Sequence, residues 1–145
     1  MVIRSIKTIM RRWRRREDGQ AIVEFALVAP IFLLLVLGVV EFGRAFNVYQ
    51  TVTDAAREGA RTAVIANPTF TLDTVAARIN ANLNGAALDT ASAIKTVTGF
   101  HTGTGTPLTV SISYPYHLGW LQPFMSWTNA QASFNMNAVI TFRNE

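Results

Sequence analysis

The sequence has no cysteine and only two histidines, His101 and His117, among its 145 residues. The absence of cysteine excludes a disulfide framework, a thiol nucleophile and the usual cysteine-containing zinc sites. The two histidines lie in predicted loops, with neither an H-E-x-x-H pattern nor a paired metal spacing. We therefore expect neither an enzyme nor a site for a metal or another cofactor.

Other signs of a small-molecule site are also missing. The turn-rich stretch GFHTGTGTP at 99–107 lacks the GK[ST] ending of a phosphate-binding loop. Acidic residues number nine, and those after residue 50 are expected on solvated helix surfaces or in turns. We expect no small-molecule substrate.

Basic residues are unevenly distributed. Seven of the 13 precede Gly19, and after that residue the chain is close to neutral. The basic block is followed by a run of uncharged, mainly apolar residues from Phe25 to Val40. A basic arm that binds nucleic acid was considered, but this arrangement favours a membrane segment with a cytoplasmic N-terminus. We expect no nucleic-acid partner.

The apolar run is long enough to cross a bilayer. Extended from Ala21 to Phe42, it corresponds to roughly 33 Å of helix, and a hydrocarbon core is about 30 Å thick. The residues that follow, EFGRAFNVYQ, contain no convincing small-x-small site for a signal peptidase. We expect a single membrane-spanning helix that stays in the protein.

Glu24 is the anomaly in this segment, because it stands just inside the apolar run. An acid in a membrane helix costs about 2.5–3.5 kcal/mol on insertion scales and calls for a partner. Gln20 lies at i−4, and the positive end of the helix dipole would also favour an acid there. An acid near the lipid headgroups that needs no partner remained an alternative.

Two separated motifs carry a resemblance to a known family. RRREDGQAIVEFALVAPIFLLLVLGVVEFGRA and, further on, TDAAREGARTAV resemble the TadE-type pseudopilins of tight-adherence (Tad, Flp) pilus systems, which are related to type IV pilins. The resemblance covers roughly Arg14 to Val64. It implies a bacterial inner-membrane protein with a periplasmic head. It also implies that the protein can be incorporated into an extracellular, adhesive pilus.

The resemblance also implies roles for particular residues. A prepilin peptidase would cut between Gly19 and Gln20, and Glu24 would then be the fifth residue of the mature chain. Phe25 would take the place of the aromatic residue that follows the Glu in Flp-type pilins. The new amino group of a neighbouring subunit would be the partner of Glu24. The implied partners are the peptidase, other Tad pilins and pseudopilins, the assembly platform and the lipid bilayer.

The helical pattern continues beyond the membrane segment. A stripe from Phe42 to Val64 predicts one helix over Gln20–Ala66, transmembrane to about residue 43 and amphipathic after it. Asn67-Pro68 is the expected stop, and Pro30 is expected to kink the helix and to take part in assembly. The segment AAREGARTA has two equally supported interpretations: a helix that covers its own head, or a surface for assembly with other subunits.

The remaining residues, 67–145, predict a small extracytoplasmic head. Apolar residues at helical spacing predict a short helix from Leu72 to Leu83, with Gly85 ending it. Alternating residues predict antiparallel strands at 108–114 and 134–142, and a weaker third at 94–98. The stretch 114–127 is interpreted as an aromatic loop that closes a small core. The fold class is therefore α+β: a long N-terminal transmembrane helix, then a head with a short helix and an antiparallel sheet.

The sequence thus predicts a basic cytoplasmic leader at 1–19, a long helix at 20–66 and a head at 67–145. The leading hypothesis is a pseudopilin or minor subunit that acts by helix packing. The alternative is an unprocessed, single-pass, membrane-anchored periplasmic binding module that uses its aromatic loop to hold a partner.

Overall fold

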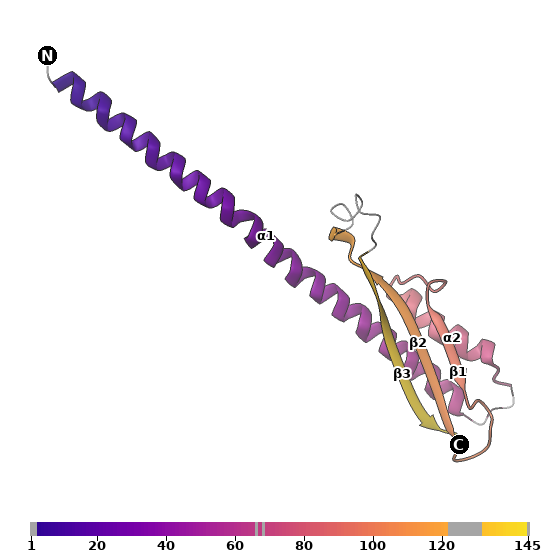
Figure 1. Ribbon diagram of the computed structural model, residues 1–145. Coiled ribbons are helices and arrows are strands. Elements are labelled where there is room, and N and C mark those ends of the chain that lie inside the picture. Colours follow the sequence, from indigo (N-terminus) through magenta and orange to yellow (C-terminus); the bar gives the residue numbers. More distant parts are fainter. Residues whose placement is uncertain (1–2, 66, 68, 122–131, 145) are drawn as a thin grey trace. The chain divides into compact units, whose positions relative to one another are not determined.

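The computed structural model describes residues 3–65, 67, 69–121 and 132–144, and for residues 3–18 and 121 the backbone alone. The chain forms two compact units, Met1–Val40 and Glu41–Glu145. Helix α1 (Ile3–Val64) contributes to both, because the boundary falls inside it (Figure 1). The first unit ends where the uncharged run of the sequence ends, at Val40.

The first unit is the N-terminal part of α1. The helix begins at Ile3, within the stretch predicted as a leader, and not at Gln20. From residue 19 to Val40 its described side chains are almost all exposed, the large apolar ones included. Within the described residues this is the one helix long and apolar enough to cross a membrane, with a mean hydropathy of 2.7 over its most apolar window. Such a surface is consistent with a single-pass membrane anchor.

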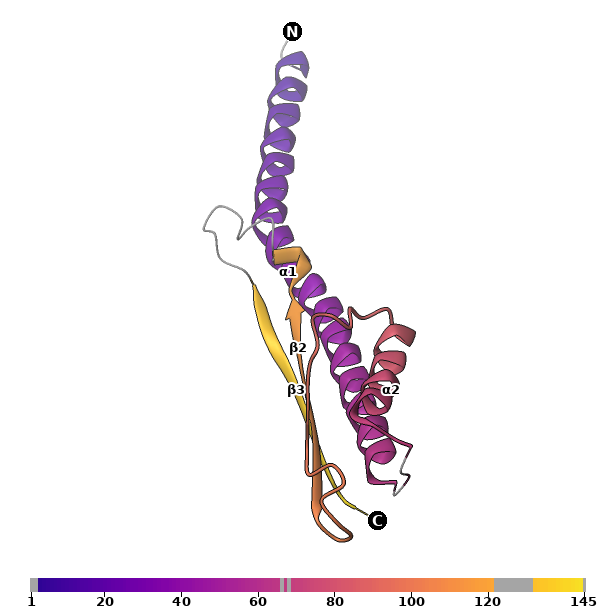
Figure 2. The ribbon, with the colours of Figure 1, turned by 90° about the vertical axis from the view of Figure 1, so that its right-hand side faces the viewer.

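The second unit contains the end of α1, helix α2 (Leu72–Gly85) and a three-stranded antiparallel sheet. The strands, in the order β1-β2-β3, are β1 (Ile94–Thr98), β2 (Pro107–His117) and β3 (Ser133–Arg143), and a 3-10 turn, η1 (Gly119–Leu121), follows β2. Figure 2 shows α2 and the last part of α1 on the same face of the sheet. The predicted α+β class is confirmed.

Alternation along β2 and β3 explains why this sheet forms. Val110 pairs with Ile140 and Ile112 with Ala138, so these apolar side chains lie together on the face that the helices cover. Strand β2 runs on to His117, so the prediction of a loop from residue 114 was wrong. Tyr114 and Tyr116 continue the alternation, and aromatic residues suit a half-buried pleated surface. Phe124 and Trp127, also assigned to that loop, lie outside the described residues.

Helix α2 begins at a capping box. The Thr71 side chain accepts a hydrogen bond from the backbone N–H of Thr74, and the Thr74 hydroxyl accepts one from the Thr71 backbone. The buried face of α2 consists of Val75, Ile79 and Leu83, and the helix ends at Gly85 as the sequence predicts. The capping box therefore fixes where α2 begins, and the apolar face follows within the next turns of the helix.

The contact between α1 and α2 depends on small residues. Val52 and four alanines of α1 are fully or almost fully buried, namely Ala55, Ala56, Ala60 and Ala63. A Cβ atom built at Gly59 would lie 2.6 Å from Ile79 Cγ1, so only glycine fits the present packing there. One face of AAREGARTA therefore packs inside its own head. The helix ends at Val64, two residues before the predicted end at Ala66.

Candidate functional sites

The residues that the sequence assigns to processing and assembly all lie in α1, in the first unit. Gly19, Gln20, Glu24, Phe25 and Pro30 are exposed. At Gly19 nothing lies within 4 Å of an added Cβ. The chain itself therefore covers none of these positions within the described part of this unit.

Glu24 makes no hydrogen bond or ion pair with any side chain that the structure describes, including Gln20 one turn earlier. Position 24 lies 21 residues after the helix start at Ile3, far beyond the first turn, so the helix dipole adds little stabilisation to this carboxylate in the uncut chain. The intrachain pairing considered from the sequence joins Glu24 to the amino group that cleavage would create on Gln20, and the uncut chain does not contain that group. A pairing within the chain, a pairing with a neighbouring subunit and an acid near the headgroups without a partner all stay predictions.

Pro30 lies inside α1, which continues through it. Proline has no N–H, so the carbonyl of Ala26 loses its usual i+4 donor. In a hydrocarbon environment an unpaired carbonyl favours contact with a donor from a neighbouring helix. This chemistry agrees with an assembly role for Pro30, which stays a prediction.

The second unit contains a buried carboxylate that sequence reasoning missed. Glu41 is the first residue of this unit and is only 5 % exposed. Tyr116 of β2 donates its hydroxyl hydrogen to Glu41 Oε1 over 2.6 Å, and Arg44 Nη1 lies 3.8 Å from Oε2. The hydrogen bond satisfies a carboxylate that would otherwise be buried without a donor. It also ties α1 to the sheet at the point where the apolar run ends.

Tyr116 is itself enclosed. It is 8 % exposed, and its ring lies 5.5 Å from that of Phe134 in a tilted arrangement. Burial, followed by the hydrogen bond to Glu41, raises the pKa of Tyr116 to about 12. The sequence signal for this pair was an acid placed directly after an apolar run, and its partner lies 75 positions away.

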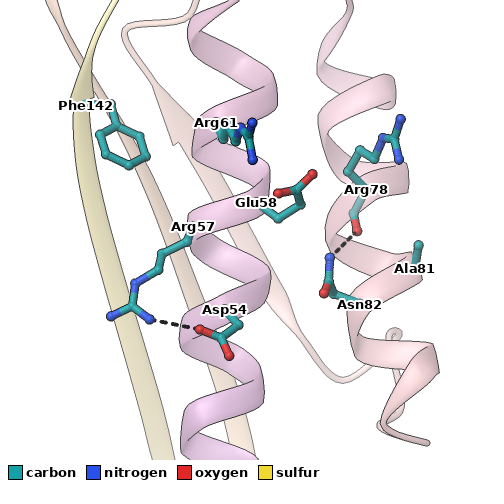
Figure 3. Close-up of a pocket in the computed structure, with 8 residues that line it drawn as sticks. All are labelled: Asp54, Arg57, Glu58, Arg61, Arg78, Ala81, Asn82 and Phe142. Atoms are coloured by element: carbon teal, nitrogen blue, oxygen red, sulfur yellow. Dashed lines mark hydrogen bonds and ion pairs between the residues drawn. The ribbon is translucent and has the colours of Figure 1, made fainter.

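A groove of about 450 Å³ crosses the exposed surface of the helices in the second unit (Figure 3). Residues of α1 and α2 and one residue of β3 line it: Asp54, Arg57, Glu58, Arg61, Arg78, Ala81, Asn82 and Phe142. Arg57 donates to Asp54 Oδ1 over 2.8 Å, and both side chains are largely exposed. Sequence reasoning treated the acids here as solvated and did not single out the arginines.

A second hollow of about 400 Å³ continues along α1 and shares Asp54 and Arg57 with the groove. Its other lining residues are Phe46, Tyr49, Gln50 and Thr53. The sequence had placed Phe46 and Tyr49 on the same stripe as the alanines of the core. Both are exposed, because the buried face of α1 turns away from them. Together the two hollows form a surface with aromatic residues at one end and arginines at the other.

Among the residues that the structure describes, no group of three or more histidines and carboxylates could hold a metal ion. His101 stacks on Phe100 with a ring separation of 3.9 Å, and no carboxylate is recorded beside it. The histidine therefore has a packing partner but no acid that would orient it for proton transfer.

Comparison with known families finds a match to the first part of the chain. The model of the family described as TadE-like protein matches residues 19–61. This segment of the chain is TadE-like. The resemblance seen in the sequence is thereby confirmed, over slightly fewer residues than Arg14 to Val64. No curated protein and no solved structure matches the chain.

The TadE-like segment begins at Gly19 and includes Glu24, Phe25 and Pro30. It continues through Glu41 to Arg61, so it also contributes all four of the α1 residues that line the groove. The family match suggests a minor subunit associated with a Tad pilus, and with it an interaction with other pilus components.

Proposed function

We propose that this chain is a pseudopilin or minor subunit that takes part in the assembly of a Tad-type pilus. A prepilin peptidase would cut it between Gly19 and Gln20, and its N-terminal helix would pack with other subunits in the filament or its assembly platform. It would reside in the bacterial inner membrane with the N-terminus cytoplasmic and the head periplasmic. In this proposal it is not an enzyme.

The observation that carries the proposal is the family match, which begins at Gly19. The exposure of Gly19 and Gln20 in α1 supports it, because no described part of the chain covers the bond to be cut. Proteolysis needs an extended backbone, so the helix would have to open locally at this point. Gly19 has no side chain whose packing would resist the opening, and glycine weakens a helix by about 1 kcal/mol relative to alanine.

Cleavage after Gly19 would also provide a charged partner for Glu24. Cleavage would create an α-amino group on Gln20, with an ordinary pKa near 7.7–8.0. Attraction between this cation and a carboxylate is strong in a low-dielectric environment, although desolvation of both groups offsets much of it. The pair would define the register between neighbouring subunits more than it would add stability.

The decisive experiment measures the intact mass and N-terminal sequence of the protein from membranes with and without a functional prepilin peptidase. We expect the mature chain to begin at Gln20 only where the peptidase is present. In peptidase-positive cells, Glu24→Gln should be cut normally yet reduce the number of assembled pili. The head variant Asp73→Asn serves as the matched control and should leave pilus number unchanged.

A chain that keeps residues 1–19 in both strains would contradict the proposal. Normal piliation with Glu24→Gln would remove the assigned role of the carboxylate. The alternative, an unprocessed membrane-anchored binding module, predicts both of these results.

A further inference from the structure

The groove on the head carries a net positive charge, because three arginines and two carboxylates line it. Arg57 is paired with Asp54, but neither Arg61 nor Arg78 has a carboxylate within 4.0 Å among the described side chains. In Figure 3 Arg61 projects from α1, and Arg78 from α2, on the side where the two helices line the groove. Glu58 lies between the two helices in the same view, so it offsets part of the positive charge and leaves room for an external anion beside the arginines.

The spacing of these two arginines is built into the fold. They belong to different helices, and those helices are locked together by the close contact of Gly59 with Ile79 and by the fully buried Ala60 and Val75. Neither helix can shift without disturbing this core. The backbone positions of the two cations are therefore organised before any ligand arrives, which lowers the entropic cost of binding.

The lining favours carboxylates of a polypeptide over a compact multivalent anion. Glu58 also lines the groove and would repel a phosphate that carries two charges more strongly than it would repel a single carboxylate. Phe142, 41 % exposed, offers an apolar surface in the same groove, and Asn82 offers an amide. Guanidinium groups match carboxylates in geometry, and an aromatic ring suits an apolar side chain.

The combined length of the groove and the adjoining hollow also favours a polypeptide segment over a small anion. The adjoining hollow shares Asp54 and Arg57 with the groove and extends it toward Phe46 and Tyr49. A single small anion would cover only one end of this surface. A chain segment with acidic side chains at one end and apolar side chains along it would cover the whole of it.

We propose that this groove binds an acidic segment of another protein chain. Its carboxylates pair with Arg61 and Arg78, and an apolar side chain covers Phe142. The inference goes beyond helix packing in the membrane, since every residue it uses lies in the second unit. The inference does not depend on cleavage after Gly19, so its test gives an answer whether or not the chain is processed.

The test uses the full-length protein in the membranes of its own cells. A photoreactive phenylalanine analogue replaces Ala81 in the groove, and another replaces Asn135, an exposed residue of β3 outside it. After illumination, mass spectrometry maps the attached chain. We expect the Ala81 probe, and not the Asn135 probe, to attach to a protein segment with at least two carboxylates.

Charge reversal then tests the pairing. The double variant Arg61→Glu and Arg78→Glu should lower the yield of this product roughly ten-fold or more, because it replaces two attractions by two repulsions. The single variant Arg143→Glu changes an exposed arginine that does not line the groove and should leave the yield unchanged. Changing the mapped carboxylates of the partner to lysine should restore the yield with the reversed groove.

Thermal unfolding of each variant confirms that the head is folded, and Arg61→Gln with Arg78→Gln replaces the reversed pair if that pair does not fold. Attachment to lipid or to a segment without carboxylates would overturn the inference. So would an equal loss with Arg143→Glu, a yield insensitive to charge, or a folded Ala81 probe that attaches to nothing.

Discussion

At the scale of single residues, Glu41 and Tyr116 show how the head accepts an acid in its interior. A carboxylate that is almost fully buried loses its hydration, and a donor at 2.6 Å compensates for part of that loss. Arg44, at 3.8 Å, adds an attraction that solvent weakens, because its own side chain is 72 % exposed. Tyr116 is therefore the partner on which Glu41 depends.

Tyr116→Phe should lower the free energy of unfolding of the head at neutral pH by about 1–3 kcal/mol, because it leaves the buried carboxylate without its donor. Tyr114→Phe on the same strand is the matched control, since the Tyr114 hydroxyl makes no hydrogen bond to any residue that the structure describes. Denaturant unfolding of the full chain in detergent, followed by near-ultraviolet circular dichroism, measures both. Equal losses in the two variants would contradict the role of the hydrogen bond.

The same pair predicts a dependence on alkaline pH. The folded state raises the pKa of Tyr116 to about 12, from an ordinary value near 10. The folded state therefore keeps the proton longer than the unfolded state, and stability falls as the pH rises from about 10 to about 12. The wild type should lose about 2–3 kcal/mol over this range through Tyr116, a loss that Tyr116→Phe should not show.

At the scale of elements, the head is held by the close approach of α1 and α2. Close approach needs small residues on one helix, and α1 supplies Gly59 and the neighbouring alanines opposite Val75, Ile79 and Leu83. Glycine is unfavourable inside a helix by about 1 kcal/mol against alanine. Its presence at position 59 is explained by the position of Ile79, which leaves no room for a Cβ atom.

Gly59→Ala should destabilise the head by up to about 2 kcal/mol, because overpacking of about 1–3 kcal/mol outweighs the gain of about 1 kcal/mol in helix propensity. Gly43→Ala is the matched control in the same helix. Nothing lies within 4 Å of its added Cβ, so it should stabilise by up to about 1 kcal/mol. Thermal unfolding compares the two, and Ile79→Val in the Gly59→Ala background should restore part of the loss. Stabilisation by Gly59→Ala would show that Ile79 moves aside freely.

At the scale of the whole molecule, the chain combines an exposed apolar helix with a small head that has its own core. The described apolar side chains up to Val40 are exposed, whereas the core of the head involves residues from Val52 onward. Exposed apolar area of this kind is stable only in lipid or against other apolar helices. A single-pass anchor accounts for the first unit.

Leu34→Asp combined with Leu37→Asp should release the protein from membranes, since each acid near a helix centre costs about 2.5–3.5 kcal/mol on insertion scales. Membrane sedimentation after alkaline carbonate extraction measures the fraction retained. Val139→Asp changes an exposed apolar residue of the head and should leave that fraction unchanged. Retention of the double variant in the pellet would show that protein contacts, and not lipid, hold the chain.

Local patterns were sufficient for much of this protein. The apolar run, the period of α2, the alternation of the strands and the TadE-like motifs each lie within a short stretch of sequence, and the structure or the family match confirms them. Such patterns arise because neighbouring residues in a helix or strand share one face. The roles of Gly19, Gln20, Glu24, Phe25 and Pro30 stay predictions, because they concern a peptidase and other subunits.

Contacts between distant residues required the tertiary structure. The hydrogen bond from Tyr116 to Glu41 joins positions 75 residues apart, and the groove combines residues of α1, α2 and β3. No periodicity indicates which face of one element meets which face of another. The sequence alone therefore determined the long apolar helix, most of the elements of the head and the TadE-like character of residues 19–61. Packing decided which acid is buried, why residue 59 is glycine and which arginines line one groove, because each depends on atoms brought together only by the fold.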